Sequence, residues 1–109
     1  MPLNNAPILL MCWDAPTAHA LVHVISAARG DVVYAPNAGE ALQRLQQFSF
    51  DAAVLCWLTG ADTVAAALRV HDVPFLMFGL PASGTAAIAN ALVVTDMDQV
   101  VPMLGMLLP

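Results

Sequence analysis

Two cysteines are the side chains with the clearest chemical potential. Cys12 and Cys56 each stand near the end of a short apolar run, ILLMCW at 8–13 and AAVLCW at 52–57. If those runs are neighbouring strands, the two thiols lie within reach of a disulfide bond or of a shared soft metal ion. The chain has no CxxC motif, and a reducing compartment would keep both thiols free. Small buried hydrophobic side chains are therefore the simpler interpretation, and a redox pair is the alternative.

The charged residues exclude several classes of function. The three basic side chains are Arg29, Arg44 and Arg69, and the 109-residue chain has no lysine, which excludes a P-loop lysine and Schiff-base chemistry. The 8 acidic residues give a formal net charge of -5, which argues against a nucleic-acid partner, because nucleic-acid backbones are themselves anionic. His19 and His23 are one helical turn apart, but no glutamate lies between them. We expect no metal, no cofactor and no enzyme activity.

The high hydrophobicity raises the question of a membrane span. The chain is 60% hydrophobic, and its mean hydropathy is +0.74. The segment from Val73 to Thr95 carries no charge and is long enough to cross a bilayer. However, prolines, glycines and polar residues divide it into short pieces, and the chain does not begin with the basic segment of a signal peptide. We expect no membrane contact and a cytoplasmic location.

Short apolar runs alternate with segments of helical periodicity along the whole chain. The expected strands cover residues 8–13, 31–35, 52–57, 73–78 and 92–94, and the expected helices cover 18–28, 38–48, 63–71, 83–91 and 97–108. Asp14 or Thr17, Asn37, Asp62 and Asp96 stand where these helices need N-terminal caps. This alternation predicts an α/β fold, in which right-handed crossovers place helices on both faces of a parallel sheet. Residues 1–109 are too few for more than a single domain.

The most specific family resemblance lies in residues 31–58, DVVYAPNAGEALQRLQQFSFDAAVLCWL. Together with VPFLMFG at 73–79 and VVTDMD at 93–98, it resembles the CheY-like receiver domain of bacterial two-component response regulators, over nearly the whole chain. The resemblance implies a flavodoxin-like (βα)5 fold, a doubly wound parallel sheet with strand order 2-1-3-4-5. The segment from Gly79 to Thr95 is shorter than in the family, which predicts a shortened fourth helix.

This chain has lost the residues through which receivers of that family act. The family places an acidic Mg²⁺-binding pair after the first strand, a phosphoryl-accepting Asp at the end of the third, a Thr or Ser after the fourth and a Lys after the fifth. The corresponding residues here are Cys12 and Trp13, with Asp14 next, then Cys56, Gly79 and Thr95. A shift of the alignment by one residue would instead put Trp13 and Asp14 at the acidic pair. In either alignment a thiol replaces the phosphoryl-accepting carboxylate, and sulfur does not suit Mg²⁺, which predicts a degenerate receiver, or pseudo-receiver.

The last expected helix, within DMDQVVPMLGMLLP, is apolar on almost its whole circumference. Such a helix must be covered, and we predict a homodimer whose core is this helix with the edge of the fifth strand. The predicted interface residues are Leu92, Val94, Val100, Val101, Met103, Leu104, Leu107 and Leu108. Cover by an attached output domain is the alternative, and residues 1–109 are then the N-terminal module of a longer regulator.

The predicted function is phosphorylation-independent signalling through contacts with other proteins. By resemblance, the domain regulates an output domain, and transcription is the commonest output of the family. A thiol-based redox sensor that uses Cys12 and Cys56 is the first alternative. Small-ligand binding in the vacated phosphorylation pocket is the second, although Trp13 and Trp57 stand beside that pocket and are expected to fill it.

Overall fold

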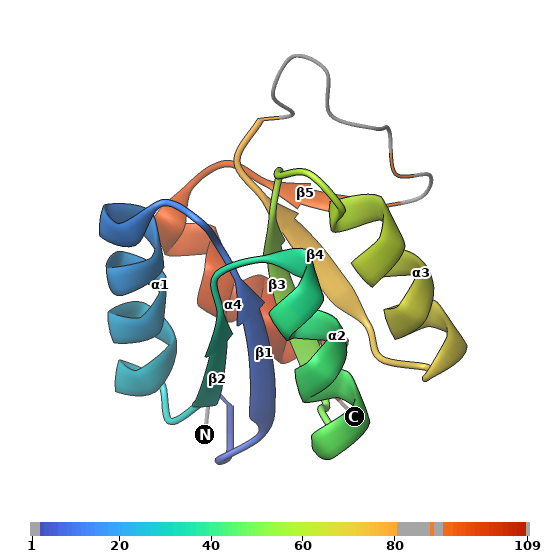
Figure 1. The fold of residues 1–109 in the computed structure, drawn as a ribbon. Coiled ribbons are helices and arrows are strands. Elements are labelled where there is room, and N and C mark those ends of the chain that lie inside the picture. The colour runs from blue at the N-terminus through green and yellow to red at the C-terminus, as the bar shows by residue number, and fades with distance from the viewer. Residues whose placement is uncertain (1–2, 81–87, 89–90, 109) are drawn as a thin grey trace.

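Five parallel strands form one sheet in the order β2-β1-β3-β4-β5 (Figure 1). The computed structural model describes residues 3–80, 88 and 91–108. The strands are β1 (Pro7–Met11), β2 (Asp31–Ala35), β3 (Ala52–Cys56), β4 (Phe75–Phe78) and β5 (Leu92–Val94). The helices are α1 (Ala15–Ala27), α2 (Ala38–Gln47), α3 (Ala61–Val70) and α4 (Met97–Leu107). The predicted α/β class and the strand order are confirmed.

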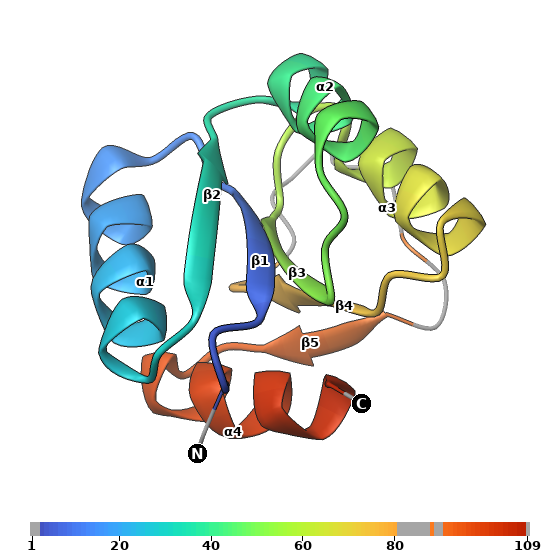
Figure 2. The same ribbon diagram turned by 90° about the horizontal axis from the view of Figure 1, so that it is seen from below.

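Helices cover both faces of the sheet. Figure 2 shows α1 and α4 on one face and α2 and α3 on the other. Alternate residues of β1 point to opposite faces, so that Leu9 packs beneath α2 and α3 while Ile8 and Leu10 pack beneath α1 and α4. All five residues of β3 are buried, because this strand lies between β1 and β4 and is covered on both sides. Because helices cover both faces of the sheet, both sets of alternating side chains in an inner strand are apolar, and the strand appears as a continuous apolar run in the sequence.

Several boundaries differ from the predicted ones. β1 ends at Met11 and β3 ends at Cys56, so both strands stop before their tryptophans. β4 begins only at Phe75, although the Pro74 carbonyl still accepts a hydrogen bond from the Ala53 backbone N–H at 3.0 Å. β1 and β3 end earlier because the chain must leave the sheet to enter the following helices.

The predicted cap of α3 is wrong. Asp62 does not cap this helix, which begins at Ala61 after Gly60 and has no side-chain hydrogen bond at its N-cap. Gly60 has a φ of 88°, a left-handed conformation that glycine adopts at low cost, and the chain therefore turns into the helix earlier than expected. Asp62 lies in the first turn, where its negative charge interacts favourably with the positive end of the helix dipole.

The predicted helix at 83–91, and with it the predicted shortening of the fourth helix, falls almost entirely outside the described residues. Only Ile88 and Ala91 of that segment are described; both lie outside regular secondary structure and pack against the α2–α3 side of the sheet. Among the residues described, none of the helices is long and apolar enough to cross a membrane.

Candidate functional site

A pocket of about 270 Å³ lies at the carboxyl edge of the sheet, where strands β1, β3 and β4 end. Its lining combines two thiols, a carboxylate, a hydroxyl and several large apolar side chains, from Cys12, Trp13, Asp14, Thr17, Cys56, Trp57, Phe78, Gly79 and Leu80. The carboxyl edge is where open parallel α/β sheets bind their ligands. Five of the six residues predicted for the degenerate phosphorylation pocket therefore come together here.

Thr95 is the predicted pocket residue that does not line this cavity. It follows β5 and is exposed. β5 is an edge strand, and β4 separates it from β3. Thr95 therefore lies apart from Cys56 because a whole strand, β4, stands between the strands that they follow and end.

The two thiols are direct neighbours. β1 and β3 are paired in register at Met11 and Leu55, so Cys12 and Cys56 stand at the next position along both strands. Adjacent strands are about 4.8 Å apart, within the Cα separation of about 4.4–6.8 Å that a disulfide bond spans. Both thiols are free and buried. In the structure it is Cys12, and not Trp13, that continues the β1–β3 register opposite Cys56.

Hydrogen bonds make the two thiols unequal. The Cys56 thiol donates to the Cys12 sulfur, and this bond lowers the pKa of Cys12 from 9.0 to about 7. The same bond, followed by burial, raises the pKa of Cys56. The Cys12 thiol also lies 3.7 Å from the Asp14 carbonyl oxygen, to which it can donate. The pair therefore loses one proton readily and retains the other, which leaves a thiolate that is stabilised by its neighbour.

Asp14 is engaged in capping α1. One carboxylate oxygen, Oδ2, accepts from the Thr17 backbone N–H at 3.2 Å and from the Thr17 hydroxyl. The extended backbone of Asp14 places its side chain over the first turn, and the predicted cap is confirmed. Asp14 is thus the one carboxylate in the pocket lining, and its position is fixed by the helix.

The two tryptophans behave differently, and the expectation that both fill the pocket is half wrong. Trp57 is buried, and its Nε1–H donates to the Gly79 carbonyl oxygen at 2.9 Å. Trp13 is 66% exposed, because the chain bends after β1 and turns this side chain outward. Gly79 has a φ of 90°, and a Cβ atom there would meet nothing within 4 Å, so the backbone conformation and not space favours glycine.

Three residues of this region were not anticipated. Phe78 and Leu80 complete the apolar wall of the pocket. The Tyr34 hydroxyl donates to the Cys12 carbonyl oxygen at 2.7 Å and ties the end of β2 to the residue that follows β1. The pKa of Tyr34 is raised, first by desolvation and then by the nearby thiols. The position of Tyr34 near the end of a strand adjacent to β1 is the signal that could have revealed it.

The predicted interface on the last helix needs correction. Val100 and Leu104 are fully buried, and Val94 is 5% exposed, so none of the three is available to a second chain. The half-buried Met103, Leu107 and Leu108 pack against the same core. α4 contacts α1, β4 and β5, and most of its apolar surface is therefore covered by its own chain.

Some apolar surface does remain exposed on α4 and β5. Met106 is 77% exposed, Val93 44% and Leu92 39%, and Val101 is half-buried. Leu92 is thus the predicted interface residue that is exposed, and Val101 retains partial access to a partner. Within the described part of the chain, no three His, Cys, Asp or Glu side chains come together as a metal site.

The fold is that of CheY-like receiver domains. The Francisella response regulator 1452 receiver domain has a TM-score of 0.76 and 16% identity, with 94% of this chain and 96% of that chain covered. SdrG from Pseudomonas melonis Fr1, in its BeF3-activated conformation, has a TM-score of 0.71 and 24% identity over 94% of this chain and 96% of that chain. The pseudo-receiver domain of the CikA protein has a TM-score of 0.70 and 20% identity, with 95% of this chain and 98% of that chain covered. No protein-family model and no curated protein sequence matches the chain. The predicted resemblance is confirmed at the level of the fold.

Proposed function

We propose that this chain is a phosphorylation-independent, receiver-like signalling domain that acts through contacts with other proteins. The observation that carries the proposal is the hydrogen-bonded Cys12–Cys56 pair at the carboxyl edge of the sheet. In the family that the sequence resembles, carboxylates that bind Mg²⁺ and accept a phosphoryl group stand at these positions. A thiol forms no aspartyl phosphate, and the chain has no lysine to pair with a phosphoryl group.

The cellular setting is proposed by resemblance. Receivers of this family act in the bacterial cytoplasm, in two-component signalling, and the commonest output is transcription. We place this chain in the same setting, as a regulator of an attached or separate output domain. Its acidic character supports a role in which it touches proteins and leaves nucleic acid to the output domain.

The test is incubation of the protein with Mg²⁺ and a small phosphodonor, followed by mass spectrometry and light scattering. We expect no phosphoryl adduct and no change in assembly, while a receiver with an intact acidic pair serves as the positive control. A stable adduct on Asp14 would overturn the proposal, because Asp14 is the carboxylate that lines the pocket.

A thiol-based redox sensor is the second candidate, and the contact between the two thiols favours it. A mild oxidant that accepts two electrons and two protons would join Cys12 and Cys56 in a disulfide bond with little backbone movement. Non-reducing mass spectrometry of the folded protein should then show the loss of two hydrogens, and neither Cys12→Ser nor Cys56→Ser should show it. Thiols that remain free in the folded protein under oxidant would leave core packing as their role.

The pocket is slightly smaller than those that hold drug-sized ligands. Pockets for drug-sized molecules enclose about 300–1,000 Å³, and this one encloses about 270 Å³. A small ligand in the vacated pocket remains the third candidate. The volume also suits a single inserted side chain, which fits a domain that functions by protein contact.

A further inference from the structure

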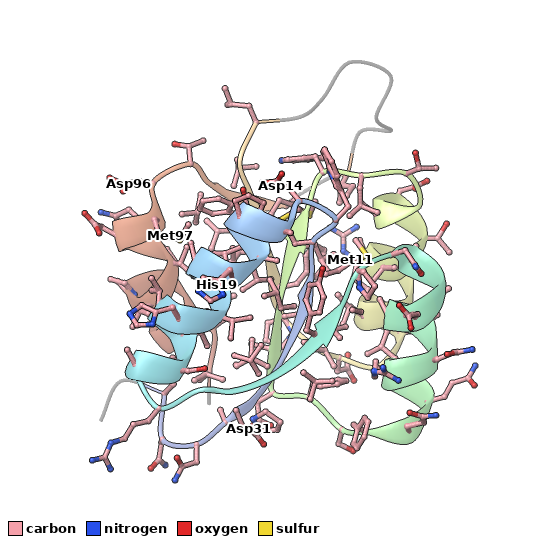
Figure 3. All side chains as sticks on the ribbon, turned by 60° about the vertical axis from the view of Figure 1, so that its left-hand side comes forward. Met11, Asp14, His19, Asp31, Asp96 and Met97 are labelled. Atoms are coloured by element: carbon pink, nitrogen blue, oxygen red, sulfur yellow. The ribbon has the colours of Figure 1, made fainter. Side chains whose placement is uncertain are left out.

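All of the net charge lies at one edge of the sheet. In a parallel α/β fold the helices begin at the carboxyl edge, and five acidic residues stand at helix starts: Asp14, Glu40, Asp62, Asp96 and Asp98. No arginine lies at this edge, so its formal charge equals the -5 of the whole chain. At the opposite edge Asp31, Asp51 and Asp72 are offset by Arg29, Arg44 and Arg69, which follow or end their helices. Figure 3 shows Asp14 and Asp96 toward the upper edge and Asp31 at the lower edge.

Helix capping explains where each acidic residue stands, but not the lack of compensating cations. Asp14 and Asp96 accept hydrogen bonds from the first turns of α1 and α4, and Glu40, Asp62 and Asp98 lie within first turns. Asp62, Asp96 and Asp98 are exposed, and Asp14 and Glu40 are half-buried. Charges of one sign that are gathered at one edge attract a cationic partner at long range.

Large apolar side chains are exposed at the same edge. Trp13 is 66% exposed and Leu80 is 76% exposed, and both border the 270 Å³ pocket whose wall includes Trp57 and Phe78. Exposed apolar groups beside a cavity and surrounded by charges are typical of a protein contact site. The pocket is open to solvent, so a side chain of a partner can enter it.

We propose that the carboxyl edge docks a cationic, extended segment of a partner protein, which inserts one apolar side chain into the pocket between Trp13 and Leu80. Arginine or lysine side chains on either side of that anchor face the acidic residues at the helix starts. Charge complementarity selects this occupant, since an acidic or nucleic-acid partner would be repelled. The arginines of a second copy lie at its opposite edge, whose net charge is near zero, so they offer no strongly cationic surface for the same contact. The proposal rests on the proposed function and specifies the surface and the chemistry of the partner.

The probe is a capped synthetic peptide with four arginines around one leucine, titrated into the full chain at low salt by calorimetry. We expect binding that weakens as salt rises. Replacement of the peptide leucine by alanine should weaken binding about tenfold, because it removes apolar surface from the pocket. A peptide with glutamates in place of the arginines should not bind.

Two pairs of variants test the location. Asp62→Asn with Asp98→Asn removes two charges from the carboxyl edge and should weaken binding about threefold to tenfold. Asp31→Asn with Asp51→Asn makes the same change in net charge at the opposite edge and should have little effect. Leu80→Ser should weaken binding, whereas Val70→Ser, at the equally exposed end of α3, should not.

Three results would overturn the docking proposal. These are no binding, equal weakening by the two charge variants, and full binding to Leu80→Ser. Equal weakening would mean that the peptide responds only to the net charge. None of these results touches the proposed function, which fails only if the phosphodonor leaves an adduct on the protein.

Discussion

Two thiols at the carboxyl edge of the sheet have different requirements for stability than two carboxylates would have. Two close carboxylates repel each other and require a cation, whereas two thiols form a hydrogen bond and pack as small hydrophobic groups. Cys12 and Cys56 illustrate this, since both are buried and each is a hydrogen-bond partner of the other. Their contact was predictable from the sequence, because the register of parallel strands fixes which strand ends meet. The outward turn of Trp13 was not, because a side chain beyond the end of a strand follows the local bend of the loop.

The thiol pair should give the protein a distinctive pH dependence. The pKa of Cys12 is about 7 in the folded chain against an ordinary value of 9.0, so between these values the unfolded chain binds more protons at this thiol. Stability should therefore rise with pH through this window, by an amount on the order of 1–2 kcal/mol. The contribution is fully present above the ordinary value and is lost as the pH falls through the folded value. For Cys56, whose pKa is raised, the sign is reversed, and stability should fall as the pH rises above 9.0.

Two measurements check this dependence. Thiolate absorbance in the ultraviolet should show one thiolate with a midpoint near pH 7 in the folded protein. Cys56→Ala removes the donor, so the midpoint should move upward toward 9.0, and urea denaturation should lose the rise in stability below that pH. An unchanged midpoint in this variant would mean that Cys56 does not stabilise the thiolate.

At the level of elements, sequence patterns predicted the described strands and helices better than they predicted which helical faces are covered. The order of elements followed from alternating apolar runs and caps, and Asp14, Asn37 and Asp96 do cap their helices. The prediction for Asp62 failed because Gly60 adopts a left-handed conformation that lets the helix begin two residues earlier than expected. The apolar circumference of α4 suggested a missing partner, but the sheet and α1 cover most of it, which only the packed structure could reveal.

Two substitutions on α4 separate its buried face from its exposed face. Leu104→Ala should lower the free energy of unfolding by about 2–5 kcal/mol, because Leu104 is fully buried beneath the helix and its loss leaves a cavity. Met106→Ala should change it by no more than about 0.5 kcal/mol, since Met106 is 77% exposed. Urea denaturation at one pH measures both. Similar values for the two variants would show that α4 packs in another orientation.

The whole molecule combines two apolar layers with a small charged surface. Only 10% of its residues are charged, and exposed apolar side chains remain on α4, on β5 and at the carboxyl edge. Low charge with exposed apolar surface favours association. We propose that the chain forms a homodimer through the exposed residues of β5 and α4, which replaces the prediction that centred on the buried Leu104.

Light scattering at micromolar concentration tests the dimer. The unmodified chain should scatter as a dimer, and Leu92→Asp with Met106→Asp should scatter as a monomer with an unchanged circular dichroism spectrum, because both side chains are exposed. Val70→Asp, which changes an exposed residue on α3, should remain dimeric. A monomer for the unmodified chain would contradict the dimer and leave an attached output domain as the partner of these residues.

The position of β1 inside the sheet, between β2 and β3, has a consequence for how the chain is made. Of the strands in this sheet β1 leaves the ribosome first, yet its neighbours are β2 and β3, and the second of these ends only at Cys56. Until β3 has been synthesised, the apolar run of β1 has only one of its two edges paired. β1, which is buried at four of its five residues in the finished sheet, is therefore the strand that waits longest for its second neighbour in the nascent chain, and the demand for chaperones should be highest before residue 56 emerges.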